Sequence, residues 1–446
     1  MKLGFLAMSG VRVHNAELAE LGMTLPGLVD RRKMIESLPS LGLLTLAGMT
    51  PDDIDIEYRD VPDLKTSPDI PLNCDAVAIS SLPARIKDAY RVADHYRTVG
   101  TKVILGGLHV TAMPDEALGH ADSIVIGEGE PSWPVLLGDL RQGRLKRIYD
   151  SRSQRFDLAE APMPRFDLLD VGRYNRVTVQ TQRGCPFKCE FCAASLLISP
   201  TYKLKPVEKV MAEIRRIKQL WPKPPFIEFA DDNTFVNKSH SKNLLRALAE
   251  ENIHWFTETD ISVAEDEELL RLMRDSGCAQ VLIGFESVSR SGLEGLELKT
   301  NWKVEQLDFY KRAITRIQDH GITVNGCFIL GLDGTGQESF DDILNFVCDS
   351  GLYDVQITIQ TAFPGTPLYD RLKMSGRILR DEAWELCTLF DVNFDPQKMS
   401  VSELEDGFRD LARKLYSVEL TDERRQRFRR QLRQVRRDSG SLTVNR

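Results

Sequence analysis

Three cysteines lie unusually close together in this sequence. Cys185, Cys189 and Cys192 fall in the stretch RGCPFKCEFCAAS, whereas the remaining cysteines of the chain, which has 8 in all, are scattered. Structural zinc takes four ligands, usually as two separated pairs, and the sequence offers no second pair and no histidine at finger spacing. Three thiolates on one short loop suit a cubane iron–sulfur cluster instead, because soft thiolates favour such clusters. One iron would then be open to another ligand, and that open position is a place for chemistry.

Composition limits the classes of partner. The chain has 446 residues, 42 % of them hydrophobic, and 58 basic against 66 acidic residues give a net charge of -8. This balance gives no general attraction to nucleic acid, so a nucleic acid partner is not expected. The N-terminus is a poor signal peptide, and no apolar run is long enough for a membrane span. Clustered thiols in a reducing compartment favour a metal over a disulfide, so we expect a cytoplasmic protein.

The elements that must position these residues begin with a repeating strand–helix pattern. Helical patterns fall between short strands, for example over 40–49 and 86–100. Strands alternating with helices in this way predict a doubly wound parallel sheet, and hence an α/β fold, over residues 1–142. The expected strands are 2–8, 54–61, 75–81, 102–107 and 123–130.

After a linker over 143–175 the pattern restarts. Six apolar strands separated by helical stretches predict a partial (β/α)6 barrel over 176–370, followed by a helical C-terminal region over 371–446. The expected strands are 177–181, 226–230, 255–259, 280–285, 324–330 and 354–360. Barrel chemistry collects at the carboxyl ends of the strands, and the three cysteines directly follow the first strand.

An arginine-rich tail ends the helical region. The stretch ERRQRFRRQLRQVRR carries arginines around Phe428, Leu432 and Val435, which fall at helical spacing. The pattern fits a solvated amphipathic helix, and it also fits a surface for an anionic partner.

The cysteine motif carries a resemblance to a known family. Cys185 to Cys192 match C-x-x-x-C-x-aromatic-C, with Phe191 at the aromatic position, and so resemble the radical S-adenosylmethionine (SAM) signature. In that family the cysteines hold a [4Fe–4S] cluster, SAM chelates the open iron, and an electron cleaves SAM to a 5′-deoxyadenosyl radical. The resemblance therefore implies a [4Fe–4S] cluster, SAM, and an external electron donor such as flavodoxin or ferredoxin.

Weaker family-like segments follow in order along the barrel. In FADDN, Asp231 and Asp232 could receive the SAM ammonium group, although either could simply cap the next helix. Ser262 resembles a ribose or carboxylate contact, and Glu286 in GFES could accept from the ribose hydroxyls or be a surface acid. The segment GCFILGLDGTGQE resembles the family's glycine-bearing adenine segment and places Ile329 there.

The front domain resembles the cobalamin-binding domain that precedes many radical SAM barrels. PSLGLLTLAG, DAVAISS, ILGGLHVTAMPDEAL and VIGEGE carry this resemblance, which implies cobalamin in the crevice at the carboxyl ends of the strands. No Asp-x-His-x-x-Gly motif supplies an axial histidine, so His109 could touch the corrin or merely pack, and the domain could also keep the fold without the cofactor. The implied cobalamin contacts are Ser80, Ser81, Gly106, Gly107, His109, Thr111, Gly127 and Glu128.

The resemblance implies a cobalamin-dependent radical SAM enzyme. The first expectation is a methyltransferase that acts on an unactivated carbon of a small-molecule substrate from a lipid or natural-product pathway. A cyclisation or rearrangement enzyme with or without cobalamin is the alternative, and a non-catalytic iron–sulfur protein is a third. A methylthiotransferase is disfavoured because it needs a second cluster and the front domain offers only Cys74. No catalytic residue beyond the cofactor and SAM contacts is predicted.

Overall fold

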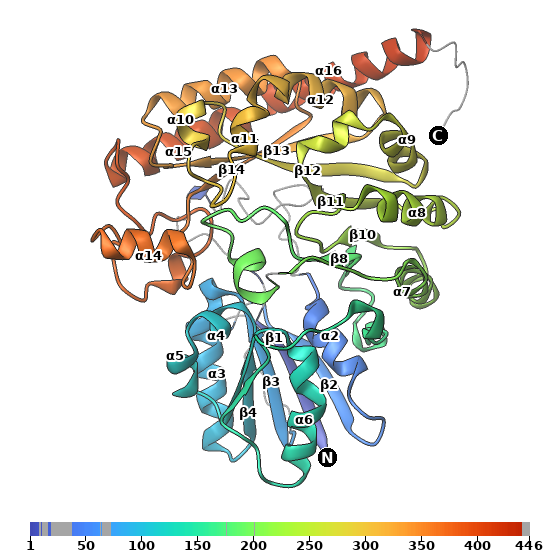
Figure 1. The fold of residues 1–446 in the computed structure, drawn as a ribbon, viewed down its shortest axis with the longest axis vertical. Coiled ribbons are helices and arrows are strands. Elements are labelled where there is room, and N and C mark those ends of the chain that lie inside the picture. Colours follow the sequence, from blue (N-terminus) through green and yellow to red (C-terminus); the bar gives the residue numbers. More distant parts are fainter. Residues whose placement is uncertain are drawn as a thin grey trace.

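The computed structural model describes residues 1–8, 10, 17–18, 38–62, 64, 73–174, 176–199 and 201–438. Two parallel sheets dominate it, and the cysteine loop lies where the two sheet-containing bodies meet (Figure 1). None of the described helices is both long and apolar enough to cross a membrane.

The first sheet is fully parallel in the order β2-β1-β3-β4-β5-β6. Chain order reverses beside β1, which has β2 on one side and β3 on the other, and such switch points open a crevice for ligands at the carboxyl ends of the strands. Its strands are β1 (Lys2–Met8), β2 (Asp55–Asp60), β3 (Ala76–Ser81), β4 (Lys102–Gly106), β5 (Ser123–Ile126) and β6 (Ile148–Asp150).

Helices cover both faces of this sheet, which explains its apolar strands. Along β1, Phe5 and Ala7 face α2 (Leu41–Gly48) and α6 (Gly129–Arg141), whereas Leu6 belongs to the core on the opposite face. That opposite face is covered by α3 (Ile86–Thr98), α4 (Leu108–Ala112) and α5 (Pro114–Leu118) (Figure 1). The predicted doubly wound sheet is therefore confirmed. Strand β6 falls inside the stretch predicted as an irregular linker, so the sheet continues past residue 142.

The second sheet is also parallel, and its six strands follow chain order as β7, β10, β11, β12, β13 and β14. Among the described residues β7 and β14 do not pair with each other, so the barrel is partial, as predicted. The strands are β7 (Arg176–Val179), β10 (Phe226–Phe229), β11 (Trp255–Thr259), β12 (Cys278–Glu286), β13 (Thr323–Leu330) and β14 (Asp354–Ile359). The helices along it are α7 (Val207–Leu220), α8 (Lys238–Leu248), α9 (Glu267–Asp275), α10 (Arg290–Leu293), α11 (Trp302–Glu305), α12 (Tyr310–Asp319), α13 (Glu338–Ser350) and α14 (Pro367–Met374).

The strands of the barrel have one apolar and one polar face. On β12, Val281 and Ile283 are buried in the apolar core, whereas Gln280 lies on the other face. We call this other face the inner face of the barrel. Glu228 on β10 and Glu258 on β11 carry acids to the inner face. Side chains alternate along a strand, so one face can pack while the other presents groups to a ligand.

Two long helices, α15 (Val401–Leu415) and α16 (Val418–Asp438), close the chain and confirm the helical C-terminus. The arginine-rich tail is α16. Its Phe428 is only 7 % exposed and meets Tyr353 with ring centroids 5.1 Å apart. Arg427 donates to the carbonyl oxygens of Cys348 and Asp349 at the end of α13. The apolar stripe thus docks on the barrel, while Arg425, Arg429, Arg430 and Arg433 remain exposed.

Candidate functional site

The cysteine loop leaves the barrel through a narrow neck. Strands β8 (Gln182–Arg183) and β9 (Lys203–Leu204) pair antiparallel and close the loop directly after β7. Gly184 begins the loop with φ +84°, and a Cβ there would come within 2.6 Å of the carbonyl oxygen of Thr201. Only glycine fits this turn, and the backbone therefore approaches itself closely at the entrance to the loop.

The barrel holds the middle of the loop at two places. Cys189 forms an antiparallel bridge with Glu297, and the amide of Leu298 donates to the carbonyl of Lys188 at 2.8 Å. On the other side, Arg371 of α14 forms an ion pair with Glu190 at 2.7 Å. The loop is thus fixed by its backbone and by an ion pair before any ligand binds.

The three cysteines are partly or fully buried, with Cys189 the most enclosed. Cys189 is 8 % exposed, and Cys192 lies close enough to both other thiols for their charges to interact. Burial raises the pKa of Cys185 to about 11 and that of Cys189 to about 12, and it also raises the pKa of Cys192. Iron binding must therefore displace protons from the thiols. Three soft ligands on one anchored loop fit a cubane cluster with an open iron.

Both carboxylate oxygens of Asp231 accept hydrogen bonds at the entrance of the loop. One carboxylate oxygen accepts from the amides of Thr181 at 2.8 Å and Gln182 at 3.1 Å, and the other accepts from the hydroxyls of Thr181 and Thr234. Burial raises the pKa of Asp231 to about 6. Asp231 does not cap the following helix either, because Asn237 is the N-cap of α8. It joins the end of β10 to the residues that lead into the neck.

Asp232, its neighbour, faces the cysteine loop. It accepts from the amide of Gly184 at 2.7 Å, is only partly buried, and lies near enough to Cys185 and Cys192 to affect their charges. No hydrogen bond to its second carboxylate oxygen occurs among the described residues. Of the two predicted carboxylates, Asp232 is therefore the one with a free acceptor toward the thiols.

Glu286 reaches the site through a distorted strand end. The register of β12 shifts between Gly284 and Glu286, and Glu286 adopts φ 62°, which is rare outside glycine. Lys303 donates to its carboxylate at 2.8 Å and to the Gly284 carbonyl at 2.6 Å. Such bulges re-aim side chains, and this one brings the Glu286–Lys303 pair beside Cys189.

Glu258 is a candidate that the sequence predictions missed. It extends from β11 onto the inner face of the barrel. Its surface is accessible to solvent, but it lies deep enough in the barrel for the surrounding protein to disfavour its charged form. Burial and the nearby carboxylates of Glu228, Asp232 and Glu286 raise the pKa of Glu258 to about 7. Its position in the alternating strand WFTET was the available signal. Lys303 lies outside any recognisable motif, so no sequence signal marked it as part of the site.

The other predicted SAM contacts are less informative. Ser262 begins a short turn after β11 and donates its amide to Asp260, which in turn binds Asn233. Ile329 is 9 % exposed on β13, and Phe191 packs in part against the core. No described contact joins Ser262 to the cysteine loop.

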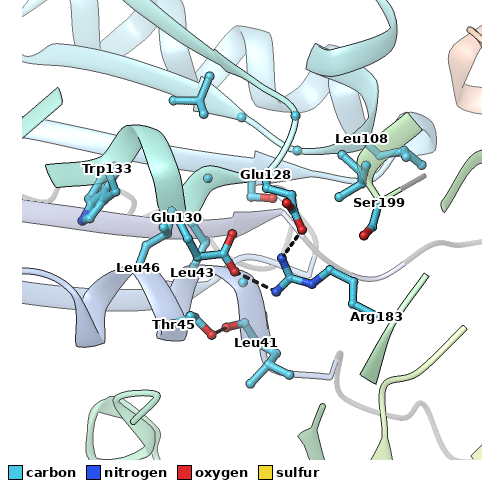
Figure 2. A pocket seen from close by; sticks show the side chains of 18 of the residues that line it. Leu41, Leu43, Thr45, Leu46, Leu108, Glu128, Glu130, Trp133, Arg183 and Ser199 are labelled. Atoms are coloured by element: carbon cyan, nitrogen blue, oxygen red, sulfur yellow. Dashed lines mark hydrogen bonds and ion pairs between the residues drawn. The ribbon is translucent and has the colours of Figure 1, made fainter. Parts of the chain in front are cut away.

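A cavity of about 410 Å³ lies between the front domain and the cysteine loop (Figure 2). Its barrel side is lined by Ala194, Ser199 and Asp232, from the loop and the end of β10. Its front-domain side includes five of the predicted cobalamin contacts, namely Ser80, Gly106, Gly107, Gly127 and Glu128. The structure therefore brings the two predicted cofactor regions to one space.

The deep part of this cavity is apolar. It runs between the α2–α6 layer and the sheet, past Leu46, Ala78, Ile104, Val125 and Trp133. At the mouth, Gly107 has φ +105°, and a Cβ there would stand 3.0 Å from the Ser80 hydroxyl. A deep apolar slot with a polar, glycine-rich mouth fits a large cofactor that inserts partly beside the sheet.

Three predicted cobalamin contacts do not line the cavity. The Ser81 hydroxyl donates to the carbonyl of Leu82. The Thr111 hydroxyl accepts from the amide of Gly127 at 3.0 Å, and so supports a residue that does line the cavity. Their role as cobalamin contacts stays a prediction, because sequence proximity to a strand end does not decide which way a side chain turns.

His109 is the third of these residues, and it is fully enclosed by protein. It is 0 % exposed, its Nε2 lies 3.3 Å from Glu116, and its ring packs edge-on against Tyr90 and Trp384. Trp384 also donates to Glu116 at 2.9 Å. In this structure His109 therefore packs where the C-terminal region meets α3 and α5, and it is not among the residues that line the cavity.

Three domain families match the chain. Residues 32–137 match the B12 binding domain, residues 179–347 match the radical SAM superfamily, and residues 366–445 match a domain of unknown function (DUF4070). These matches follow the order of the front sheet, the barrel and the C-terminal region.

Curated relatives align over most of the chain. The bacteriochlorophyllide d C-8(2)-methyltransferase of Chlorobaculum tepidum is 30 % identical over 329 residues, which cover 70 % of this chain and 71 % of that protein. The bacteriochlorophyllide d C-12(1)-methyltransferase of the same organism is 27 % identical, covering 85 % of this chain and 83 % of that one. The hopanoid C-2 methylase of Rhodopseudomonas palustris is 27 % identical over 77 % of this chain and 66 % of that protein.

A solved structure shares the whole arrangement. The radical SAM methyltransferase TsrM from Kitasatospora setae, with cobalamin and a [4Fe–4S] cluster bound, gives a TM-score of 0.69 at 14 % identity. The match covers 99 % of this chain and 100 % of that one, and it shows a common fold.

Proposed function

The chain belongs to the cobalamin-dependent radical SAM methyltransferases, and from this premise we propose that it methylates an unactivated carbon of a small-molecule substrate from a lipid or natural-product pathway. Its cofactors are a [4Fe–4S] cluster, SAM and cobalamin. When bound, the cluster supplies the electron that cleaves SAM and the corrinoid supplies the methyl group.

The shared cavity is the observation that carries this proposal. Gly107 and Gly127 of the front domain and Ala194 and Asp232 of the barrel line one space. A methyl donor on one side and a radical generator on the other would both act on a substrate held between them. Holding reactants in one enclosed space accelerates their reaction and keeps competing solvent out.

We assign cluster binding to Cys185, Cys189 and Cys192. We assign the ammonium group of SAM to Asp232, which lies near Cys185 and Cys192 and whose second oxygen accepts no hydrogen bond from the described residues. Asp231 then serves as the support of the loop entrance rather than as a SAM contact.

Glu258 and the Glu286–Lys303 pair complete the proposed SAM site. Carboxylates on neighbouring strands suit a ligand that carries both an ammonium and a sulfonium group, because the ammonium donates charged hydrogen bonds and the sulfonium charge attracts the carboxylates. A bound cation would also favour the charged form of Glu258 and lower its pKa from about 7. Ser262 and Ile329 remain predicted contacts of SAM.

The names of the relatives support the substrate class. They identify a bacteriochlorophyllide and a hopanoid as substrates of the related methyltransferases, and we extend the small-molecule class to this chain. We also propose flavodoxin or ferredoxin as the electron donor. A cytoplasmic location follows from the need to keep three thiols reduced.

The test is an anaerobic reconstitution. The protein is loaded with iron and sulfide, incubated with hydroxocobalamin and desalted, and its absorption spectrum is recorded. SAM and a reductant are then added, and the products are measured by mass spectrometry. Retained corrin bands with both 5′-deoxyadenosine and S-adenosylhomocysteine support methyl transfer through cobalamin. 5′-Deoxyadenosine without retained corrin would overturn it.

A further inference from the structure

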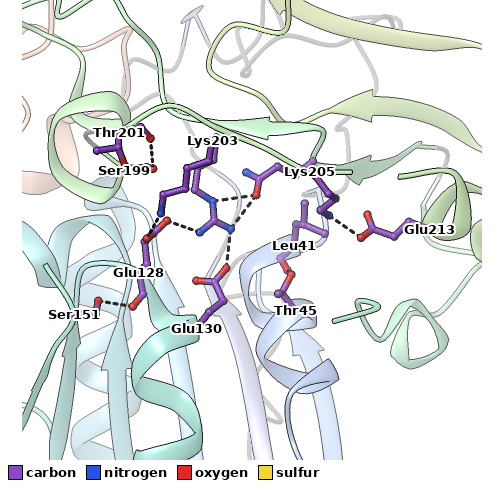
Figure 3. Close-up of polar contacts among 12 residues, drawn as sticks. Leu41, Thr45, Glu128, Glu130, Ser151, Ser199, Thr201, Lys203, Lys205 and Glu213 are labelled. Carbon is purple, nitrogen blue, oxygen red and sulfur yellow. Dashed lines mark hydrogen bonds and ion pairs between the residues drawn. The ribbon is translucent and has the colours of Figure 1, made fainter. Parts of the chain in front are cut away.

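Four charged side chains fasten the neck of the cysteine loop to the front domain (Figure 3). Arg183 on β8 donates to Glu128 at 2.8 Å and to Glu130 at 2.7 Å. Lys203 on β9 donates to the second oxygen of Glu128. Gln180 accepts from the same guanidinium at 3.0 Å, so Arg183 is bound on three sides. We call these four charged residues, Arg183, Lys203, Glu128 and Glu130, the neck clamp.

The neck depends on the clamp for electrostatic reasons. Arg183 and Lys203 are direct cross-strand partners in the β8–β9 ladder, where two like charges destabilise the pairing. Glu128 bridges both cations and removes that repulsion. The side chains of Glu128 and Glu130 are each 7 % exposed, and that of Arg183 is 16 % exposed. Removing one partner would therefore leave a buried charge without compensation.

Only one residue separates the clamp from the first cysteine of the loop. Arg183 is followed by Gly184, whose amide is held by Asp232, and then by Cys185. A ligand that fixes Cys185 also restrains the neck, because only Gly184, whose amide is held by Asp232, separates Cys185 from Arg183. The order of the loop and the position of Arg183 are thus tied together.

The front-domain side of the clamp belongs to the wall of the cavity. Glu128 is the N-cap of α6 and Glu130 lies in its first turn, and both line the 410 Å³ cavity. Ser151 at the end of β6 donates to the carbonyls of Ile126 and Glu128, which fixes this turn from below. A ligand that orders the turn therefore also orders the carboxylates that hold the neck.

We propose that the neck clamp couples the two cofactor sites, so that filling the cysteine loop with its cluster strengthens cobalamin binding in the front domain. Arg183 and Glu130 act as positioning residues. The inference rests on the proposed function, because it needs cobalamin in the cavity. Coupling between two binding sites is reciprocal, so cobalamin must strengthen cluster retention by the same factor.

The experiment measures hydroxocobalamin dissociation constants by absorption after equilibrium dialysis. Each protein is measured without the cluster and again after anaerobic reconstitution with iron and sulfide. The ratio of the two constants within one protein is its coupling factor, and changes in intrinsic affinity cancel. We expect a wild-type factor of about 10, within the usual range for coupled sites.

Four variants separate the clamp from general effects. Arg183→Met and Glu130→Gln should each bring the factor close to 1, whereas Arg183→Lys keeps the charge but loses the forked contact and should give an intermediate value. Arg215→Met removes an arginine of α7 that binds Glu251 just past the end of α8, and it should leave the factor unchanged. In the wild type, hydroxocobalamin should also raise the amount of iron chelator needed to remove half of the iron.

The outcomes are distinct. A wild-type factor near 1, or a wild-type factor preserved in both Arg183→Met and Glu130→Gln, overturns the coupling and leaves the proposed function intact. A wild type that binds no hydroxocobalamin in either state overturns the proposed function and the coupling with it. Loss of the factor in the two clamp variants but not in Arg215→Met supports the clamp.

Discussion

Asp231 offers a sharp test of how the cluster loop is positioned. Its two oxygens accept four hydrogen bonds from Thr181, Gln182 and Thr234, at the point where β7 leads into the neck. We compare Asp231→Ala with Asp231→Asn in the cluster-free chain. The first removes all four acceptor contacts, whereas the second preserves the shape of the side chain.

The two substitutions should differ greatly in stability. Alanine leaves the buried amides of Thr181 and Gln182 without an acceptor, and each such group costs about 1–3 kcal/mol, so we expect a loss of about 2–6 kcal/mol. Asparagine can keep its oxygen on the two amides and donate to the two hydroxyls, which rotate to accept. We expect it to cost less than about 1.5 kcal/mol near neutral pH.

The pH dependence separates the wild type from Asp231→Asn. Burial raises the pKa of Asp231 from its ordinary 3.8 to about 6. The folded chain therefore takes up a proton there before the unfolded chain does, and stability increases as the pH falls through about 6. Between pH 8 and pH 5 the wild type should gain about 1.4 kcal/mol relative to Asp231→Asn, in which this group does not titrate.

The assay combines urea unfolding at the two pH values with iron content and SAM affinity after reconstitution. Asp231→Ala should lose most of its iron together with its stability. Asp232→Asn is the matched control, and it should keep the iron but bind SAM about tenfold more weakly, because one charged hydrogen bond is lost. If Asp231→Ala kept stability and iron and lost only SAM affinity, Asp231 would be a SAM contact and the reasoning would be refuted.

Three further predictions follow from the same contacts. Changing Cys185, Cys189 or Cys192 to alanine should abolish both the iron–sulfur absorption and SAM cleavage, and cleavage retained in any one variant would contradict the cluster assignment. Phe428→Ala should lower stability in urea by about 3 kcal/mol, because a buried ring is lost, and an unchanged midpoint would mean that α16 is not docked. Burial alone would raise the pKa of Glu130, but the adjacent guanidinium lowers it below its ordinary 4.5. Its stabilising effect is therefore present above that pH and lost as the pH falls further, and Glu130→Gln should remove this part of the acid dependence, as acid titration of both proteins would reveal.

The sequence predicted the strands of both sheets closely. Residues 2–8 were expected as a strand and are β1, and 102–107 contains β4. Apolar runs bounded by glycine and polar residues mark such buried strands, because the signal is local. The clustering of Cys185, Cys189 and Cys192 was likewise local, since one short loop supplies all three thiols.

Predictions for single site residues depended on contacts that the sequence does not reveal. Gly107 and Gly127 line the cavity, whereas His109 packs against Trp384, which lies far along the chain. Asp231 and Asp232 are adjacent in sequence. Asp231 accepts four hydrogen bonds, whereas one oxygen of Asp232 accepts none from the described residues. No local pattern distinguishes these cases, because the partners come from other strands.

The sequence alone therefore determined the order of the two sheets, the cysteine loop after the first barrel strand and the family to which the chain belongs. These depend on periodicity and spacing within short stretches. The tertiary structure decided the rest, namely that Arg183 and Lys203 meet Glu128 and Glu130, that Glu258 stands among other carboxylates, and that one cavity joins both cofactor regions. Charges act on whatever lies within a few ångströms, and only the folded chain brings residues so distant in sequence within that range.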